Sequence, residues 1–149
     1  MREKPVFWCA ALVVLLLDQA AKYLIQLKLV PYKSVPVLNG IFHITYIRNT
    51  GAAFGLFGGF RIPLVIVGIA VSAAVIYFHF RTQQRLGLQA PLGLILGGSA
   101  GNLVDRIFRS YVIDFIDFKF WPAFNVADIA VNLGILLILI RLFLRKEPV

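Results

Sequence analysis

Four long apolar stretches constrain the fold of this 149-residue chain more than any other feature of its sequence. They run roughly over residues 6–27, 62–80, 91–107 and 125–144. About 20 consecutive apolar residues are enough for an α-helix to cross the hydrocarbon core of a bilayer. The pattern therefore predicts an all-α integral membrane protein with four transmembrane helices, in a single membrane domain that spans residues 1–149.

The composition excludes the common classes of soluble protein. Hydrophobic residues make up 60% of the chain and charged residues only 15%, whereas a soluble domain carries charge on roughly a quarter of its residues. The net charge of +8 does not indicate nucleic-acid binding, because Lys and Arg are scattered over tails and loop edges without a basic patch. Scattered cations beside apolar segments are typical of contact with lipid headgroups, so membrane lipids are the expected surroundings.

The same cations bear on orientation, because cytoplasmic loops of membrane proteins are enriched in Lys and Arg. Four spans place both termini on one side. Raw counts of Lys and Arg do not distinguish the two sides, but the tails and the loop over residues 81–90 are short and so concentrate their charge. We therefore expect both termini to be cytoplasmic.

Residues 33–55 are expected to form a small extracytoplasmic β-hairpin or sheet. β-Branched and aromatic residues flank Asn39-Gly40, a pair favoured in tight hairpin turns because both positions accept positive φ. Strict alternation along residues 41–47 would then give the hairpin one apolar face. The run from Asn49 to Gly55 is rich in glycine and small residues, which predicts either a tight re-entry turn or a wall that approaches a ligand closely.

The third apolar stretch carries a stripe of glycines at every fourth position, Gly93, Gly97 and Gly101. Such a stripe permits the close approach of another helix, and it also suits a groove for the lipid part of a substrate. Neither reading is excluded by the sequence.

Polar residues follow the glycines at the end of the same stretch. Asn102, Asp105 and Arg106 have spacings that place them on one helical face. Asp105 and Arg106 are either an interfacial charge pair or members of a site. In the first stretch, Asp18 and Lys22 are one turn apart, and they either pair within the helix or contact another helix or a substrate.

Two further aspartates are the strongest candidates for chemistry. Asp114 comes just after the third stretch and Asp128 begins the fourth, each at a junction with a short loop. Asn125 and Asp128 have the spacing of a capping box, so Asp128 alone indicates a helix start. Delivered to the same side of the bilayer, Asp114 and Asp128 form a pair of carboxyls able to share a proton and activate water against a peptide bond.

No metal site or cofactor is predicted. Cys9 is the only cysteine, and His43 and His79 are isolated from each other and from any acid at ligand spacing. The alternatives to an aspartic endopeptidase are a small proton-coupled carrier, whose path would need polar residues through the depth of the bundle, and a lipid-binding scaffold.

Five short motifs occur in the order seen in the lipoprotein signal peptidases, the type II signal peptidases of bacteria, and the chain resembles that family from its first apolar stretch to the start of its fourth. The motifs are Asp18-Gln-Ala-Ala-Lys22, Arg48-Asn-Thr-Gly-Ala-Ala-Phe54, Gly98-Ser-Ala-Gly-Asn-Leu-Val-Asp-Arg106, Val112-Ile-Asp-Phe115 and Phe124-Asn-Val-Ala-Asp128.

The resemblance implies a four-helix aspartic protease of the bacterial cytoplasmic membrane, with its active site at the outer face. Such an enzyme removes the signal peptide from prolipoproteins, cutting just before a cysteine that carries a diacylglyceryl group. By motif match, the catalytic pair falls on Asp114 and Asp128, and Asp117 is a close neighbour that must not be mistaken for a partner. The supporting residues implied by the matching motifs are Asp18, Lys22, Asn49, Gly51, Asn102, Asp105, Arg106 and Asn125.

Overall fold

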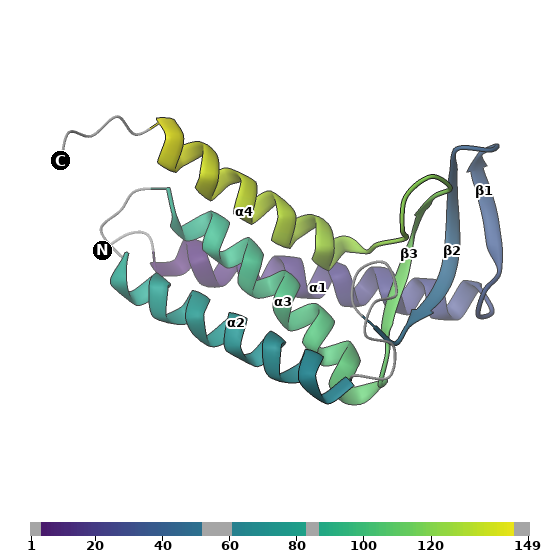
Figure 1. Cartoon of the computed structure of the whole chain (residues 1–149), viewed down its shortest axis with the longest axis horizontal. Coiled ribbons are helices and arrows are strands. Elements are labelled where there is room, and N and C mark those ends of the chain that lie inside the picture. Colours follow the sequence, from purple (N-terminus) through teal and green to yellow (C-terminus); the bar gives the residue numbers. More distant parts are fainter. Residues whose placement is uncertain (1–3, 52–60, 83–86, 145–149) are drawn as a thin grey trace.

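The fold is four helices with a small sheet at one end, in a computed structural model that describes residues 4–51, 61–82 and 87–144 (Figure 1). In chain order the elements are α1 (Lys4–Lys28), β1 (Ser34–Leu38), β2 (Phe42–Asn49), α2 (Arg61–Arg81), α3 (Gln89–Phe108), β3 (Val112–Phe118) and α4 (Val126–Leu144). The four predicted helices are confirmed, and each predicted end lies within two residues of the observed one. The predicted turn that follows Asn49 falls mostly outside the described residues.

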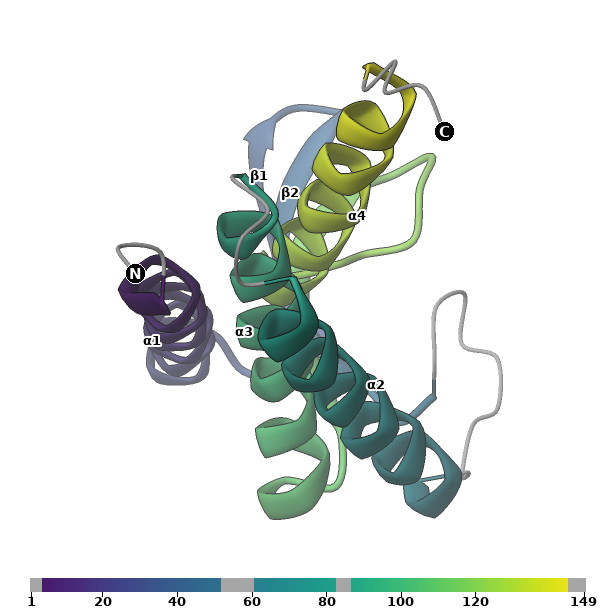
Figure 2. The same ribbon diagram turned by 90° about the vertical axis from the view of Figure 1, so that its left-hand side faces the viewer.

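Three of the described helices, α1, α2 and α4, are long and apolar enough to cross a membrane. The central helix α3 is as long as α4, but it is less apolar because it carries glycines and ends in Asn102, Asp105 and Arg106. It does not need an apolar surface all round, since the other helices cover it. Figure 2 shows α3 in the middle, with α1 on one side and α2 and α4 splayed apart on the other.

The glycine stripe on α3 is a helix-packing surface. A Cβ atom at Gly93 would lie 2.5 Å from the carbonyl oxygen of Phe7, and one at Gly97 would lie 2.5 Å from that of Ala11. Real Cβ atoms do not approach this closely, so only glycine lets the α1 and α3 backbones meet. Of the two readings of this stripe, helix packing is therefore confirmed, and a lipid groove along it is wrong because α1 fills the space.

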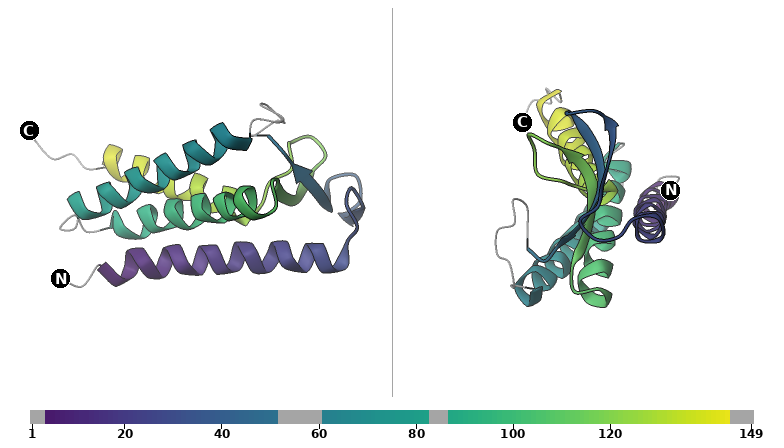
Figure 3. Two further views of the ribbon diagram at one scale, coloured as in Figure 1. Left: turned by 90° about the horizontal axis from the view of Figure 1, so that it is seen from below. Right: turned by 90° about the vertical axis from the view of Figure 1, so that its right-hand side faces the viewer.

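The sheet closes the end of the bundle opposite the start of α1 and the end of α4 (Figure 3). Its strands are antiparallel in the order β1-β2-β3. The hairpin between β1 and β2 is confirmed, but its turn differs from the expected one. Of the two central residues of the turn, Asn39 and Gly40, only Gly40 has a positive φ, at 76°. The Ile41 amide donates to the Leu38 carbonyl at 3.0 Å. This is the pattern of a type II turn, which needs positive φ at one position alone.

Strict alternation along β2 was a wrong expectation. Ile44 pairs with Ile116 and Ile47 with Asp114, so β2 has one residue more than β3 between these two pairs. This extra residue is a β-bulge, which interrupts the alternation and bends the strand. Thr45 and Tyr46 are consequently both buried, although they are neighbours in sequence.

The strand β3 was not predicted from the sequence. Its residues were expected to be a loop, whereas they pair with β2 along almost their whole length. A polar residue, Asp114, occupies its middle and is almost fully buried. This strand places Asp114 on a rigid element beside α4 instead of on a mobile connection.

Candidate active site

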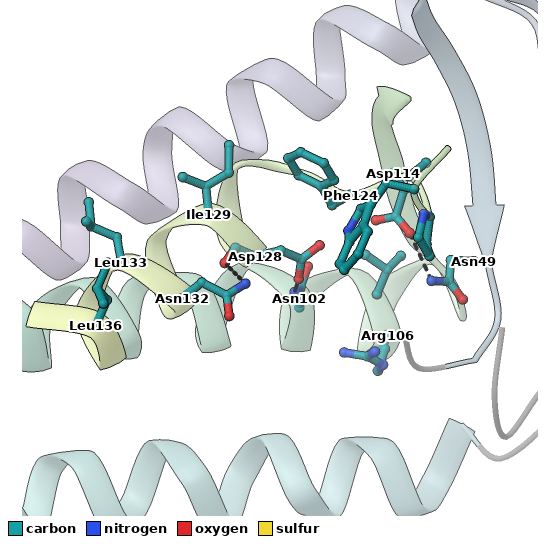
Figure 4. Close-up of a pocket in the computed structure, with 14 residues that line it drawn as sticks. Asn49, Asn102, Arg106, Asp114, Phe124, Asp128, Ile129, Asn132, Leu133 and Leu136 are labelled. Carbon is teal, nitrogen blue, oxygen red and sulfur yellow. Dashed lines mark hydrogen bonds between the residues drawn. The ribbon is translucent and has the colours of Figure 1, made fainter. Parts of the chain in front are cut away.

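Asp114 and Asp128 line the same pocket, although they come from different kinds of element. Asp114 lies on β3 and Asp128 in the first turn of α4, and Figure 4 shows both carboxyls at one end of the pocket. The pocket has a volume of about 560 Å³. Its lining residues are Asn49, Asn102, Arg106, Val112, Asp114, Trp121, Pro122, Ala123, Phe124, Asp128, Ile129, Asn132, Leu133 and Leu136.

The capping box predicted at the start of α4 is confirmed. The Asp128 backbone N–H donates to Asn125 Oδ1 at 3.0 Å, and the Asn125 backbone N–H donates to Asp128 Oδ2 at 3.2 Å. This reciprocal pair stabilises the first turn of the helix. The cap also uses only one carboxylate oxygen of Asp128, and the other accepts a hydrogen bond from Asn102 Nδ2 at 2.8 Å. The capping role and a place in the site therefore coexist in one residue.

Asn125 links the two carboxyls. Its side-chain Nδ2 donates to Asp114 Oδ1 at 2.7 Å, while its backbone holds Asp128. Asn49, at the end of β2, donates to the other oxygen of Asp114 at 2.9 Å. The Gly51 amide donates to Asn49 Oδ1 at 2.9 Å, which orients the Asn49 side chain toward Asp114. The predicted residues Asn49, Gly51 and Asn125 thus converge on Asp114.

Burial raises the pKa of Asp114 to about 6 from an ordinary value of 3.8. The negative charge of Asp128 raises it further, while the hydrogen bonds from Asn49 and Asn125 oppose the shift. Burial prevails because a carboxylate in a poorly solvated site loses most of its hydration. Asp114 therefore holds a proton more readily than an ordinary aspartic acid does.

A fully buried ion cluster lies directly behind the pocket. Lys22 Nζ is 2.7 Å from Asp18 Oδ2 and 2.9 Å from Asp105 Oδ2, and all three side chains are 0% exposed. Lys22 also donates to Asn102 Oδ1 at 3.1 Å. The two readings of Asp18 and Lys22 are both confirmed, since they pair within α1 and also contact another helix.

The two acids of this cluster hold the backbone immediately before each pocket aspartate. Asp18 Oδ1 accepts a hydrogen bond at 3.0 Å from the amide of Ala127, the residue before Asp128. Asp105 Oδ2 accepts one at 3.1 Å from the amide of Ile113, the residue before Asp114. Lys22 joins both acids, so one buried cation fixes the spacing between the strand and the helix that carry the two carboxyls.

Arg106 and Asp105 point different ways, so of their two readings the one as an interfacial charge pair is wrong. Arg106 lines the pocket and donates to the Gly51 carbonyl at 3.3 Å. Asp105 pairs with Lys22 and with Arg109, which was not singled out from the sequence. The spacing of Asp105 and Arg109, one helical turn, is the signal that would have found this pair.

Asp117 belongs to a separate contact on the sheet. It accepts hydrogen bonds from Thr45 Oγ1 and Lys119 Nζ, each at 2.6 Å, and it does not line the pocket. These bonds lower its pKa, against the opposing effect of burial, which is the largest single influence. Within the described parts of the chain, no three His, Cys, Asp or Glu side chains are grouped to hold a metal ion.

Comparison with known proteins identifies the family. A family profile described as signal peptidase (SPase) II matches residues 10–144. The chain belongs to the signal peptidase II family. Lipoprotein signal peptidases from Halothermothrix orenii and Desulfitobacterium hafniense are 36% and 43% identical to it, over 94% and 95% of this chain and 97% of each relative.

Two solved structures of bacterial membrane enzymes share the fold. One has a TM-score of 0.89 at 31% identity, covering 98% of this chain and 95% of the other. The second has a TM-score of 0.85 at 33% identity, with 97% and 96% covered. The protein is therefore a membrane-embedded bacterial peptidase that removes signal peptides from prolipoproteins. The expected alternatives of a carrier and a lipid-binding scaffold give way to this membership.

Proposed function

We propose that Asp114 and Asp128 form the catalytic dyad of this signal peptidase and cleave the peptide bond with an activated water. The observation that carries the proposal is the double role of Asn125, whose side chain bonds Asp114 and whose backbone bonds Asp128. Because one residue holds both carboxyls in one pocket, both can act on the same peptide bond. Neither carboxyl makes an ion pair with a described residue, and both line the pocket, so both can exchange protons with a water and a substrate that lie there.

The raised pKa of Asp114 supports a role for it as the acid. In this mechanism Asp114 is protonated when the substrate binds and donates that proton to the oxygen of the scissile carbonyl. Asp128, as the carboxylate, takes a proton from water, and the resulting hydroxide attacks the carbonyl carbon. The tetrahedral gem-diol then collapses. Asp114 takes a proton from one of its hydroxyls, the C–N bond breaks, and the proton held by Asp128 passes to the leaving amine. Arg106 and Asn102 line the same pocket and stabilise charge beside the dyad.

The substrate class follows from the shape of the pocket beyond the dyad. From Asp128 the pocket continues along α4 past Ile129, Leu133 and Leu136, which give it an apolar floor (Figure 4). Acyl chains of a diacylglyceryl cysteine fit such a floor, and they would place the bond before that cysteine against the dyad. This groove on α4 takes the role that the glycine stripe was expected to have.

The same proposal fixes the topology. The chain forms one membrane domain over residues 1–149, with α3 as a fourth span and the sheet outside the cytoplasmic membrane. Both termini are then cytoplasmic, and the dyad lies at the outer face, where exported precursors arrive. In a Cys9→Ser background, a membrane-impermeant thiol reagent should label Asn39→Cys in intact cells and should not label Thr82→Cys. The reverse pattern would contradict this orientation.

The dyad is tested by near-isosteric amide replacements. Asp114→Asn and Asp128→Asn should each abolish cleavage of a diacylglyceryl-modified precursor in a gel-shift assay, because an amide cannot exchange the required proton. Asp117→Asn is the matched control, since this third acid is bonded on the sheet away from the pocket. Near wild-type turnover in either dyad variant, or inactivation by Asp117→Asn, would refute the assignment.

Recognition of the lipid needs a separate measurement. Initial rates on a diacylglyceryl-modified precursor should greatly exceed those on the same precursor with an unmodified cysteine. Leu133→Gln puts a polar group on the apolar floor. It should reduce the rate on the modified precursor more than it reduces the rate on the unmodified one. Equal rates on the two precursors would show that the lipid is not recognised.

A further inference from the structure

A second pocket lies at the opposite end of the bundle from the dyad, on the seam between α3 and α4. It has a volume of about 470 Å³, within the range of pockets that hold small molecules. Its lining residues are Gly87, Pro91, Leu137, Ile140, Arg141 and Leu144. The α4 members are spaced at three- and four-residue intervals and share one face of the helix. This face is apolar except for Arg141.

Arg141 is the cation of this pocket, and its guanidinium is not fully paired within the described part of the chain. Its Nε atom is shielded from solvent and has no hydrogen-bond partner among the described residues. The described acidic side chains all make their contacts in the other half of the molecule, around Lys22, Asn125 and Lys119. A shielded guanidinium N–H without an acceptor is unfavourable, because the group loses water and gains nothing in return. The described residues supply no acceptor to this N–H, so a ligand that carries one would suit the site.

The backbone next to Arg141 is shaped to keep the guanidinium in place. Gly87 has a φ of +85°, which L side chains rarely adopt. A Cβ atom at this position would also collide with the guanidinium of Arg141. The glycine thus serves two purposes, since it makes the turn into α3 and leaves the room that Arg141 occupies.

The chemistry of the pocket selects its ligand. A guanidinium presents a planar fork of N–H donors that matches a phosphate group, and it interacts with a phosphate more strongly when both are partly desolvated. The apolar wall of Leu137, Ile140 and Leu144 runs along a helix that crosses the membrane. Basic pockets between transmembrane helices on the cytoplasmic side bind lipid headgroups in this way.

We propose that this pocket is a binding site for an anionic phospholipid of the leaflet on the side of the chain termini. The phosphate bonds to Arg141, and an acyl chain lies along the apolar face of α4. The lipid then bridges α3 and α4 at the end of the bundle that has no sheet to tie the helices together. Its effect is on the stability of the bundle, since the dyad lies at the other end (Figure 1).

The proposal is tested with the full-length protein in detergent. Native mass spectrometry would measure retention of phosphatidylglycerol, with phosphatidylcholine as the lipid of no net charge and inorganic phosphate as the anion without acyl chains. Thermal unfolding with each additive supplies a second readout. The wild type should retain phosphatidylglycerol in preference to phosphatidylcholine and should be stabilised by it.

Arg141→Gln should weaken phosphatidylglycerol binding roughly tenfold, the effect of losing a charge-assisted hydrogen bond to phosphate. The matched control is Arg81→Gln, which removes a cation at the same end of the molecule. Arg81 already contacts Tyr77, whose hydroxyl oxygen accepts its Nε–H at 3.0 Å, and it lies outside the pocket. This control variant should bind phosphatidylglycerol as the wild type does.

Three results would overturn the proposal. Equal retention of both phospholipids would remove the preference for an anion. An equal loss in Arg81→Gln would indicate a diffuse effect of charge in place of a site. Stabilisation by inorganic phosphate as strong as that by phosphatidylglycerol would mean that the acyl chain contributes nothing.

Discussion

Replacing Lys22 with glutamine should disrupt both stability and catalysis, although Lys22 does not line the pocket. The change removes one cation from two ion pairs of 2.7 and 2.9 Å in which every side chain is 0% exposed. Removing one partner of a buried pair costs about 3–5 kcal/mol, because the remaining charges are left uncompensated. Here Asp18 loses the ion pair that it makes within the described residues, and Asp105 keeps only its pair with Arg109. We therefore expect Lys22→Gln to lose about 3–5 kcal/mol in its free energy of unfolding.

Catalysis should fall as well, because Asp18 and Asp105 hold the amides that precede the two dyad residues. A displacement of about 1 Å in catalytic groups reduces a rate roughly 100-fold. The assay is denaturant unfolding of the purified protein, combined with cleavage of a lipidated precursor under conditions where the variant remains folded.

Lys119→Gln provides the control for a change of charge alone. Lys119 also pairs with an aspartate, at 2.6 Å from Asp117, but its side chain is 44% exposed. Exposed pairs contribute up to about 1 kcal/mol. If Lys22→Gln proved no less stable and no less active than Lys119→Gln, the ion cluster would not position the dyad, and the argument from its contacts would be refuted.

Three further predictions concern the dyad and the packing around it. Because burial raises the pKa of Asp114 to about 6, the folded protein keeps a proton that the unfolded chain releases near pH 3.8. The stability from this group is therefore complete below about pH 3.8 and is lost as the pH rises through 6. The free energy of unfolding should decline across this window, and Asp114→Asn should make the decline smaller; the same decline in the variant would contradict the argument. Asn125→Ala should lose about 1 kcal/mol from the helix cap and should also lose cleavage activity, and a stable, fully active variant would show that the bridge between the carboxyls is not needed. Gly97→Ala should lose about 1–3 kcal/mol in its free energy of unfolding through overpacking against α1. Gly68→Ala is the control and should be tolerated, because the nearest atom to its new Cβ would be Leu103 Cδ1 at 3.3 Å. Equal unfolding midpoints of the two variants would mean that the close approach of α1 and α3 is not required.

The sequence predicted the helices well because their signal is local. A continuous apolar run predicts a membrane helix from its own residues alone, whatever the rest of the chain packs against it. For this reason the predicted ends agree with those of α1 to α4. The strand β3 has no such signal. Its seven residues form a strand only by pairing with β2, which lies more than sixty residues earlier in the chain. A charged residue within the strand, Asp114, also made the segment look like a loop.

The site residues could be named from the motifs, but their connections could not. Capping spacing correctly predicted the bonds between Asn125 and Asp128. Nothing in the sequence showed that Asp105 would contact Lys22, because Lys22 lies on α1 and only the packing of α1 against α3 brings the two side chains together. The same packing determined that the glycines of α3 face α1.

The position of the ion cluster in the chain has a consequence for biosynthesis. Asp18 and Lys22 emerge early from the ribosome, and their pairing one turn apart within α1 lets each enter the membrane with its charge already matched. Their remaining partners arrive later, Asp105 with α3 and the Ala127 amide with α4. With Asp114 and Asp128 as the proposed dyad, a nascent chain that ends before residue 128 lacks one of the two carboxyls, so cleavage activity is expected only after α4 has been synthesised and inserted.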